Sequence, residues 1–394
     1  MVDLAARAAT LLDTAPRGLV WGLVVVRLVT LALVITDANR NPVTDVDVVR
    51  AERIATSPAR PYRDFSVEYM PLETAVIEIV AGDGPPATAT RLAILAFVGD
   101  LAAAAALAHG WGRRPAAIYL LLGLPLLTFM YQRFDPVAVA LAAWALALSA
   151  RRRDVVSGAL LGLAVLAKLW PIVLVPALWI RRRWASLAAG AAVGIAGGAW
   201  WFLWGGPKGP VQVLTFRGAV GWSVESVVGN IIWIVTAGHG SLEAGAIRIG
   251  VAPTWAKALL LAGLIATETT LWIRARQDRD LAGGTALAAV TALLVFSPLF
   301  SIQYSAWLLP WAAIAFDGDA EERRIATLAA AVIAMCGVLS LSYQSAAPAT
   351  DVLEKWLLLV RNATCVGVVA LWITRPRVGS APPGLITRAT RVTA

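Results

Sequence analysis

Charge, cysteine and histidine are all scarce in this chain, and each scarcity excludes a class of protein. Only 15% of the 394 residues are charged, whereas 59% are hydrophobic. So little charge cannot cover a water-facing surface of this size, so the sequence predicts a polytopic membrane protein without a separate soluble domain. The two cysteines (Cys336, Cys365) lie in apolar stretches and the two histidines (His109, His239) stand alone, so we expect no disulfide framework, metal site or other cofactor.

Lysine is rare as well: the chain has four lysines and thirty arginines, and its net charge is +9. The arginines occur in short runs at the ends of apolar stretches, where the positive-inside rule places them. This basicity therefore does not indicate nucleic-acid binding. Anionic membrane lipids are the expected partners of the basic runs.

The apolar stretches predict about twelve membrane spans, since a helix needs about 20 apolar residues to cross a bilayer. The first, 19–35, is too long for a signal-peptide core and no cleavage site follows it, so we expect it to remain as a helix. If the arginine triplets 151–153 and 181–183 are both cytoplasmic, the chain between them must rise and return as two short helices that meet near Lys168. The whole chain, 1–394, is then one domain with both termini cytoplasmic. The other spans are expected near 87–109, 116–130, 136–150, 184–204, 254–273, 281–298, 302–316, 325–344 and 353–374.

The basic runs fix this orientation, and the unusual polar motifs then gather on the opposite, extracytoplasmic side. Two loops lie there, 38–86 and 205–253, and residues 39–78 of the first hold seven acids and five arginines. We expect a short interfacial helix at 48–57 and a short re-entrant or interfacial helix at 225–237. One extracytoplasmic cavity can use all of these motifs.

Asp45 and Asp47 in the first loop can serve as a general base and its neighbour, because two carboxylates stand two residues apart beside a helix end. Asp45 can instead cap the helix that follows. Glu68 can also be purely structural, since it can pair with Arg63 in a solvated network that contributes little to stability. Glu73 has no evident role.

Lys168 interrupts an apolar stretch, and an ionisable residue inside a membrane segment is a functional candidate by default. It can also extend to the interface and remain structural. Arg217 and Glu225 bracket a glycine-rich turn and can form a structural pair, or Arg217 can hold a phosphate. Arg133 and Asp135 have the same two interpretations.

Ser297-Pro298 breaks an apolar helix near its outer end, and Gln303 and Tyr304 follow at once. Broken helices at membrane depth line protein or water, so we expect a cavity wall there, with Gln303 either as polar lining or as a donor to a sugar or phosphate. Most of the seventeen tryptophans are expected to be interfacial anchors, whereas Trp170 and Trp222 are candidates to stack on a sugar ring. Arg361 in the last span requires a buried partner.

Seven motifs in order carry a family resemblance over nearly the whole chain. The chain resembles the polyprenol-phosphate-mannose-dependent mannosyltransferases of glycosyltransferase family 87, within the GT-C superfamily. Val49 and Met70 stand where the family has Tyr and Pro, which bears on acceptor preference more than on the fold. The motifs are Asp45 to Val49, Pro61-Tyr62, Tyr69-Met70-Pro71, Lys168-Leu169-Trp170-Pro171, Arg217 with Glu225-Ser226, Ser297-Pro298 before Gln303-Tyr304, and Arg361-Asn362.

The resemblance implies an all-α, GT-C-type bundle in the plasma membrane whose extracytoplasmic loops form the active site. It also implies an inverting transfer of mannose from polyprenyl-phosphate mannose to a lipid or glycan acceptor of the cell envelope. Asp45 matches the catalytic base, with Asp47 and Glu68 as second candidates. Lys168 and Arg217 are expected to bind the donor phosphate, so a metal is not required. Further substrate-binding candidates are Arg63, Tyr69, Trp170, Glu225, Gln303 and Tyr304.

Two other functions remain open from the sequence. An arabinofuranosyl or other pentosyl transferase with a polyprenyl-phosphate donor would have the same chemistry and another sugar. A membrane transporter or lipid flippase would also have broken helices and membrane charges, but inverted repeats would favour it and the sequence shows none. Charged motifs on one side favour the enzyme.

Overall fold

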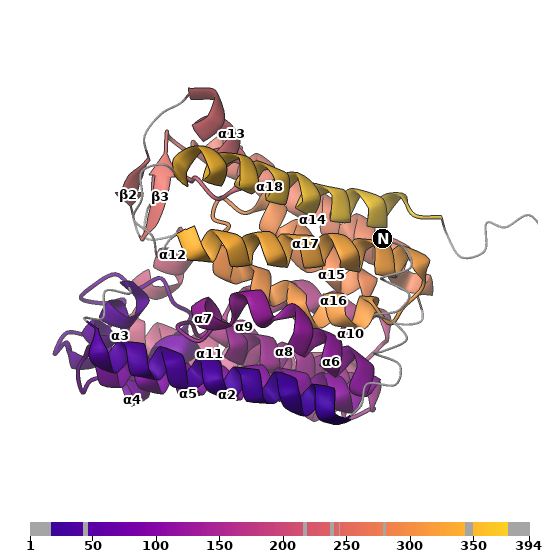
Figure 1. Ribbon diagram of the computed structural model, residues 1–394, viewed down its shortest axis with the longest axis horizontal. Coiled ribbons are helices and arrows are strands. Elements are labelled where there is room, and N and C mark those ends of the chain that lie inside the picture. The colour runs from indigo at the N-terminus through magenta and orange to yellow at the C-terminus, as the bar shows by residue number, and fades with distance from the viewer. Residues whose placement is uncertain are drawn as a thin grey trace, which may run out of the picture.

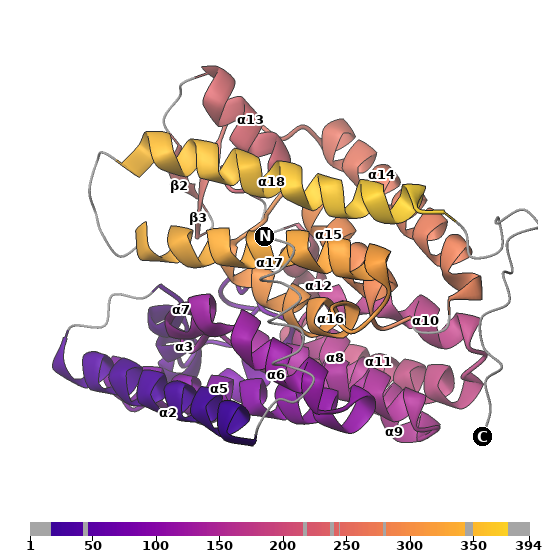
Figure 2. The same ribbon diagram turned by 45° about the vertical axis from the view of Figure 1, so that its right-hand side comes forward.

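A computed structural model describes residues 17–41, 46–215, 219–236, 240–243, 245–278, 281–342 and 350–376. Within these ranges the chain is a bundle of helices in two layers (Figures 1 and 2): α2 to α11 form one layer and α13 to α18 the other. Six helices of the described part of the chain are long and apolar enough to cross a membrane. They are α2 (Arg17–Arg40), α5 (Pro85–Trp111), α11 (Trp184–Gly205), α14 (Thr254–Arg274), α17 (Ala320–Ser342) and α18 (Thr350–Thr374). A multi-pass helical membrane protein is therefore confirmed.

Shorter elements occupy the remaining predicted spans. The 116–130 stretch is broken at Gly123, next to Pro125, because proline removes a backbone donor and cannot continue the helix before it. A similar break at Pro310 divides 302–316. The elements are α6 (Arg113–Leu122), η1 (Leu124–Leu126), α7 (Leu127–Met130), α8 (Asp135–Ala150), α9 (Asp154–Ala167), η2 (Trp170–Leu174), α10 (Val175–Ile180), η4 (Ala275–Gln277), α15 (Gly284–Phe296), η5 (Ile302–Leu308) and α16 (Leu309–Ala315).

The hairpin predicted around Lys168 is present. Helix α9 ends at Ala167, and Lys168 has an extended backbone that turns the chain into η2 and α10. The two arginine triplets lie side by side, since Arg183 Nη1 is 3.6 Å from Asp154 Oδ1 and Arg183 Nη2 donates to the Ser149 carbonyl at 3.1 Å. The 14 residues of α9 rise about 21 Å, so Lys168 lies far from this basic end.

Both triplets end a helix in the same way. Arg152 and Arg182 have positive φ angles of 59° and 54°. The amide of Arg153 donates to the Leu148 carbonyl at 2.9 Å and that of Arg152 to Ser149 at 3.0 Å, which is the Schellman pattern. The second triplet repeats both bonds. A left-handed conformation is unfavourable for a side chain with a Cβ, so each turn keeps an arginine where glycine would fit better.

Arg152→Gly and Arg182→Gly are therefore expected to stabilise the fold by about 0.5–1 kcal/mol each, because glycine removes the left-handed strain. The measurement is thermal unfolding of the purified protein in detergent, and the two effects should add because the turns are separate. Arg153→Gly, next to the first turn, is the control and should not stabilise. A lower unfolding temperature in both variants would show that the arginine side chains contribute more than the backbone strain costs.

The end of the bundle opposite the triplets carries the short helices and a small sheet (Figure 1). Helices α3 (Val46–Thr56) and α13 (Val227–Thr236) confirm the two short helices predicted in the loops. The sheet was not predicted: its strands have the order β1-β3-β2, are all antiparallel, and are too short for a periodic pattern. The other elements at this end are α4 (Pro71–Val80), α12 (Lys208–Leu214), β1 (Trp222–Ser223), β2 (Ser241–Glu243) and β3 (Ala246–Ile249).

A charged group is buried inside the N-terminal layer. Arg27 Nε of α2 lies 2.7 Å from Asp100 Oδ2 of α5, and both side chains are completely buried. The hydroxyls of Tyr119 and Tyr131 donate to the same carboxylate at 2.8 and 3.0 Å. This network joins α2 and α5 to α6 and to the turn that follows α7.

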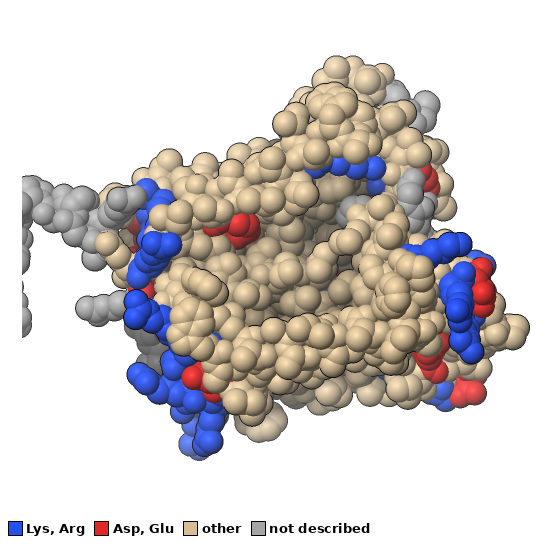
Figure 3. Space-filling view, turned by 180° about the vertical axis from the view of Figure 1, so that it is seen from behind, with Lys and Arg blue, Asp and Glu red and all other residues tan. Residues whose placement is uncertain are grey.

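On the face that Figure 3 shows, charged side chains gather mainly at the two ends, with a largely uncharged, hollowed band between them. Helices α11 and α14 are the most exposed of the six long helices, with 11% of each apolar segment buried. An apolar helix with so little protein around it is compatible with lipid contact. Arg375 pairs with Asp278 at the triplet end, so α18 ends on the same side as the basic runs.

Candidate functional site

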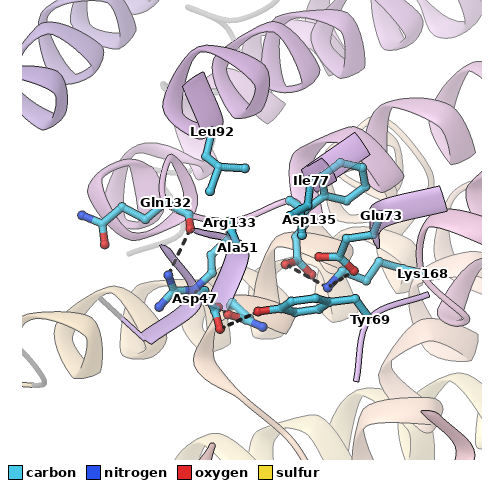
Figure 4. Close-up of a pocket in the computed structure, with 12 residues that line it drawn as sticks. Asp47, Ala51, Tyr69, Glu73, Ile77, Leu92, Gln132, Arg133, Asp135 and Lys168 are labelled. Carbon is cyan, nitrogen blue, oxygen red and sulfur yellow. Dashed lines mark hydrogen bonds and ion pairs between the residues drawn. The ribbon is translucent and has the colours of Figure 1, made fainter. Parts of the chain in front are cut away.

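A narrow pocket lies at the end of the bundle opposite the triplets, where the first loop packs on the helix breaks (Figure 4). Helices α3 and α4 form one wall, and the turn between α7 and α8 together with Lys168 forms the other. Its cavity volume is about 20 Å³, enough for about one water molecule, because the side chains contact one another across it. The lining residues are Asp47, Ala51, Tyr69, Glu73, Ile77, Leu92, Gln132, Arg133, Phe134, Asp135, Lys168 and Gln303.

Asp47, in the first turn of α3, is held by three side chains. Its Oδ2 lies 3.1 Å from Arg133 Nε, and its Oδ1 accepts hydrogen bonds from the Tyr69 hydroxyl at 3.0 Å and from Arg50 Nη1 at 3.3 Å. Burial by itself would raise the pKa of Asp47, but the nearby positive charges, Arg133 first, lower it below its ordinary value. Asp47 is therefore a well-anchored carboxylate and a weakened base.

Glu68 joins the group of charged side chains around Asp47, since its Oε1 lies 2.6 Å from Arg50 Nη1. Burial raises the pKa of Tyr69 well above its ordinary value, with the Asp47 charge acting in the same direction. Tyr69 therefore stays a neutral donor to Asp47. Arg133 also donates to Gln303 Oε1 at 2.8 Å, which connects this group to η5.

Lys168 lies between two buried carboxylates on the other side of Tyr69 (Figure 4). Its Nζ is 3.0 Å from Glu73 Oε2 and 3.9 Å from Asp135 Oδ2, and it lies over the Tyr69 ring at 5.5 Å from the centroid. Burial raises the pKa of Glu73 to about 8, although the Lys168 charge opposes the shift. The ammonium is thus paired inside the protein, with 15% of the Lys168 side chain exposed.

An aromatic stack supports Asp135 from behind. Trp307 Nε1 donates to Asp135 Oδ1 at 2.6 Å. The Trp307 ring stacks with Tyr304 and Trp170, at 4.2 and 5.4 Å between ring centroids. Trp170 is 2% exposed, so its place here is to pack against Trp307 rather than to present a free face for a sugar.

The structure brings together some of the predicted site residues and not others. Asp47, Tyr69, Lys168 and Gln303 line the pocket, with Glu68 and Tyr304 directly behind them. Asp45 and Arg217, the predicted base and one predicted phosphate ligand, lie outside the described residues. Arg63 is exposed on the loop.

Glu225 and Arg361 form a separate buried group that does not line the pocket. Arg361 Nη2 donates to the Glu225 backbone carbonyl, and the guanidinium lies 3.8 Å from the centroid of the Phe300 ring. A backbone oxygen, which no sequence pattern identifies, is thus a partner of Arg361. Trp222 is buried in β1 and pairs with Ile249 of β3, so it also belongs to the fold.

Glu73 and Trp307 were missed by the sequence analysis. Glu73 lies on the buried face of α4, since Thr74 and Ile77 beside it are buried as well. The sequence feature that could have identified Glu73 is an acid on the apolar face of an amphipathic helix. No sequence feature singles out Trp307, because tryptophan is common in membrane proteins. Among the described residues, no group of three or more histidines, cysteines and acids is placed to hold a metal ion.

The fold and the pocket define a multi-pass membrane protein that holds carboxylates and cations together at one end of a helical bundle. The family model of glycosyltransferase family 87 matches residues 69–298, more than half of the chain. The chain therefore belongs to glycosyltransferase family 87, and it is a membrane glycosyltransferase. The matched segment includes Glu73, Asp135 and Lys168, whereas Asp47 precedes it. No curated protein matches this chain.

Proposed function

We propose that this protein is an inverting glycosyltransferase that moves mannose from polyprenyl-phosphate mannose to a hydroxyl of a lipid or glycan acceptor. The observation that carries the proposal is the pocket itself, in which Asp47 lies with Arg133 and Lys168 beside apolar helices. A lipid-linked donor needs a site at the membrane surface. A sugar phosphate needs cations for its charge and a carboxylate for the acceptor proton.

The reaction is a single displacement. A carboxylate takes the proton of the acceptor hydroxyl, and the acceptor oxygen forms a bond to the anomeric carbon from the face opposite the phosphate. The bond between that carbon and the phosphate oxygen breaks, and its electron pair leaves with polyprenyl phosphate. The product glycoside has the opposite anomeric configuration to the donor.

Asp45 is the proposed base, and Asp47 is proposed to position the site. Asp47 already accepts hydrogen bonds or charge from Arg133, Arg50 and Tyr69, and its pKa is lowered, so it takes a proton poorly. Asp45 directly precedes α3 and matches the base of the family that the sequence resembles.

Cations of the chain are proposed to take the charge of the leaving phosphate. Lys168 has three N–H donors and can keep its contact with Glu73 while it binds a phosphate oxygen. Arg217 is the second proposed ligand. Arg133 joins them on structural grounds, because it faces the same pocket. With these charges available the proposed mechanism requires no metal.

The proposed topology places the pocket outside the cytoplasm. Contacts at the basic end, among them Arg183 with Asp154, Arg375 with Asp278 and Arg181 with the Asp278 carbonyl, involve arginine runs that the positive-inside rule assigns to the cytoplasm. We propose about twelve crossings of the plasma membrane, with the short helices as broken spans and both termini cytoplasmic.

The test is a transfer assay with the purified protein in detergent, polyprenyl-phosphate mannose and a panel of lipid and glycan acceptors. Transfer with inversion supports the proposal. Transfer only from a polyprenyl-phosphate arabinofuranosyl donor would replace the sugar and keep the mechanism. No transfer from either donor, together with lipid movement across proteoliposomes, would favour a flippase.

Lys168→Met is expected to raise the KM for the donor about 10-fold or more, because a charged contact to phosphate is lost while the side-chain volume is kept. Initial rates at varied donor concentration measure this change. Lys208→Met is the matched control, since Lys208 is exposed on α12 and does not line the pocket. An unchanged KM in Lys168→Met would contradict the phosphate assignment.

A further inference from the structure

Two buried carboxylates in the pocket have no task in the proposed reaction. Glu73 is 3% exposed and Asp135 is 1% exposed. They come from different elements, α4 and the first residue of α8, and they meet at Lys168 (Figure 4). A buried acid is costly unless its oxygens are paired, so this arrangement requires an explanation.

The donors within the described chain do not satisfy both carboxylates. Asp135 Oδ1 accepts from Trp307 Nε1, but Asp135 Oδ2 has no hydrogen-bond donor among the described residues and lies 3.9 Å from Lys168 Nζ. Each carboxylate has about four acceptor positions, and one ammonium group has three donors. A ligand that brings neutral O–H donors would complete both groups.

The two acids need donors, which limits the ligands that fit this side of the pocket. Phosphate oxygens have no donors of their own, so they can contact the Lys168 ammonium but cannot satisfy Glu73 and Asp135. A metal ion is not favoured, because no group of three acids, histidines or cysteines comes together in the described chain. Sugar hydroxyls are neutral donors and meet both requirements.

We propose that Glu73 and Asp135 bind neighbouring hydroxyls of the transferred sugar, so that the pocket selects a polyhydroxylated glycosyl group. This inference rests on the proposed function. In a sugar phosphate the hydroxyl on C2 lies one carbon away from the anomeric carbon that carries the phosphate. One ligand can therefore contact Lys168 with its phosphate and the adjacent carboxylates with its hydroxyls.

The supporting residues hold these carboxylates in fixed positions before a ligand binds. Trp307 orients Asp135 and itself stacks with Tyr304 and with Trp170. The Tyr69 ring lies under Lys168 and lines the same pocket as the two acids. Carboxylates with an adjacent aromatic ring match the polar edge and the apolar face of a pyranose. Binding must widen the cavity, whose volume is only about 20 Å³.

The experiment is a double-mutant-type cycle in which one change is made in the protein and the other in the donor sugar. The wild type, Glu73→Gln and Asp135→Asn are assayed with polyprenyl-phosphate mannose and with its 2-, 3-, 4- and 6-deoxy analogues, and kcat/KM is measured for each pair. We expect the wild type to lose about 10- to 100-fold when a bound hydroxyl is removed, as for a hydrogen bond to a charged group. The variant that lacks the matching carboxylate should lose no more than about two-fold further on the same analogue.

Glu78→Gln is the matched control, because Glu78 is exposed on the same helix as Glu73, and it should behave as the wild type does. Equal losses in the wild type and both variants for every analogue would overturn the inference while leaving the proposed function intact. If a variant fails to fold, the wild-type series still tests the inference. Losses of kcat/KM below about two-fold for all four analogues would overturn the inference. Absence of any transfer by the wild type would overturn both.

Discussion

Asp45→Asn is expected to lower turnover by at least about 100-fold, the scale for removing a general base, while leaving the KM for the donor within a few-fold. The amide has nearly the shape of the carboxylate but cannot take the acceptor proton. The measurement is kcat with saturating polyprenyl-phosphate mannose and a competent acceptor. A shift of the optimum to higher pH, where the acceptor hydroxyl is more readily ionised, should accompany the loss.

Asp47→Asn is the informative comparison. Its carboxylate anchors Arg133, Arg50 and Tyr69, so the amide should weaken donor binding through misplacement of Arg133. We therefore expect a raised KM with a smaller fall in kcat. If Asp45→Asn keeps activity within a few-fold and Asp47→Asn abolishes turnover, the roles are exchanged and Asp47 is the base. Glu68→Gln would be the next variant to assay.

Arg27→Met is expected to destabilise the fold by about 3–5 kcal/mol, the largest effect on stability predicted here, because it leaves the Asp100 carboxylate buried without its countercharge. The tyrosine hydroxyls of Tyr119 and Tyr131 would still donate to Asp100 but bring no positive charge. Thermal unfolding in detergent, followed by fluorescence of the native tryptophans, measures the change.

Adding Asp100→Leu to Arg27→Met should recover part of the loss, since an apolar pair removes the uncompensated charge. Recovery will be incomplete because two buried hydroxyls lose their acceptor. Arg91→Met is the matched control: Arg91 also pairs with an acid, Asp83, but both side chains are largely exposed and such pairs contribute little. An Arg27→Met protein as stable as the control would show that the buried pair is not needed for the fold.

Much of the fold followed from the sequence because lipid imposes a simple rule. Backbone groups in a bilayer must be paired within helices, so a long apolar run has few alternatives to a helix. The hairpin at Lys168 followed from the positive-inside rule, since two arginine triplets on one side require an even number of crossings between them. The small sheet did not follow, because strands of two to four residues carry no pattern and depend on a partner strand.

The site followed only in part. Lys168 was visible as a charge in an apolar stretch, and Asp47 and Glu68 as members of an acidic loop. Asp135 was open to two interpretations until Trp307, 172 residues away, showed which way its carboxylate is held. The sequence assigned no role to Glu73, because its contact with Lys168 depends on where α4 packs.

The amino-acid sequence by itself determined that this protein is a multi-pass helical membrane protein with seven of its 25 acids in residues 39–78, because hydropathy and arginine position act locally along the chain. Tertiary structure alone decided which charges meet. Arg27 reaches Asp100 across 73 residues, and Glu73 reaches Lys168 only after α4 has docked on the hairpin. The energy of a buried charge depends on neighbours that packing supplies, and no local pattern records them.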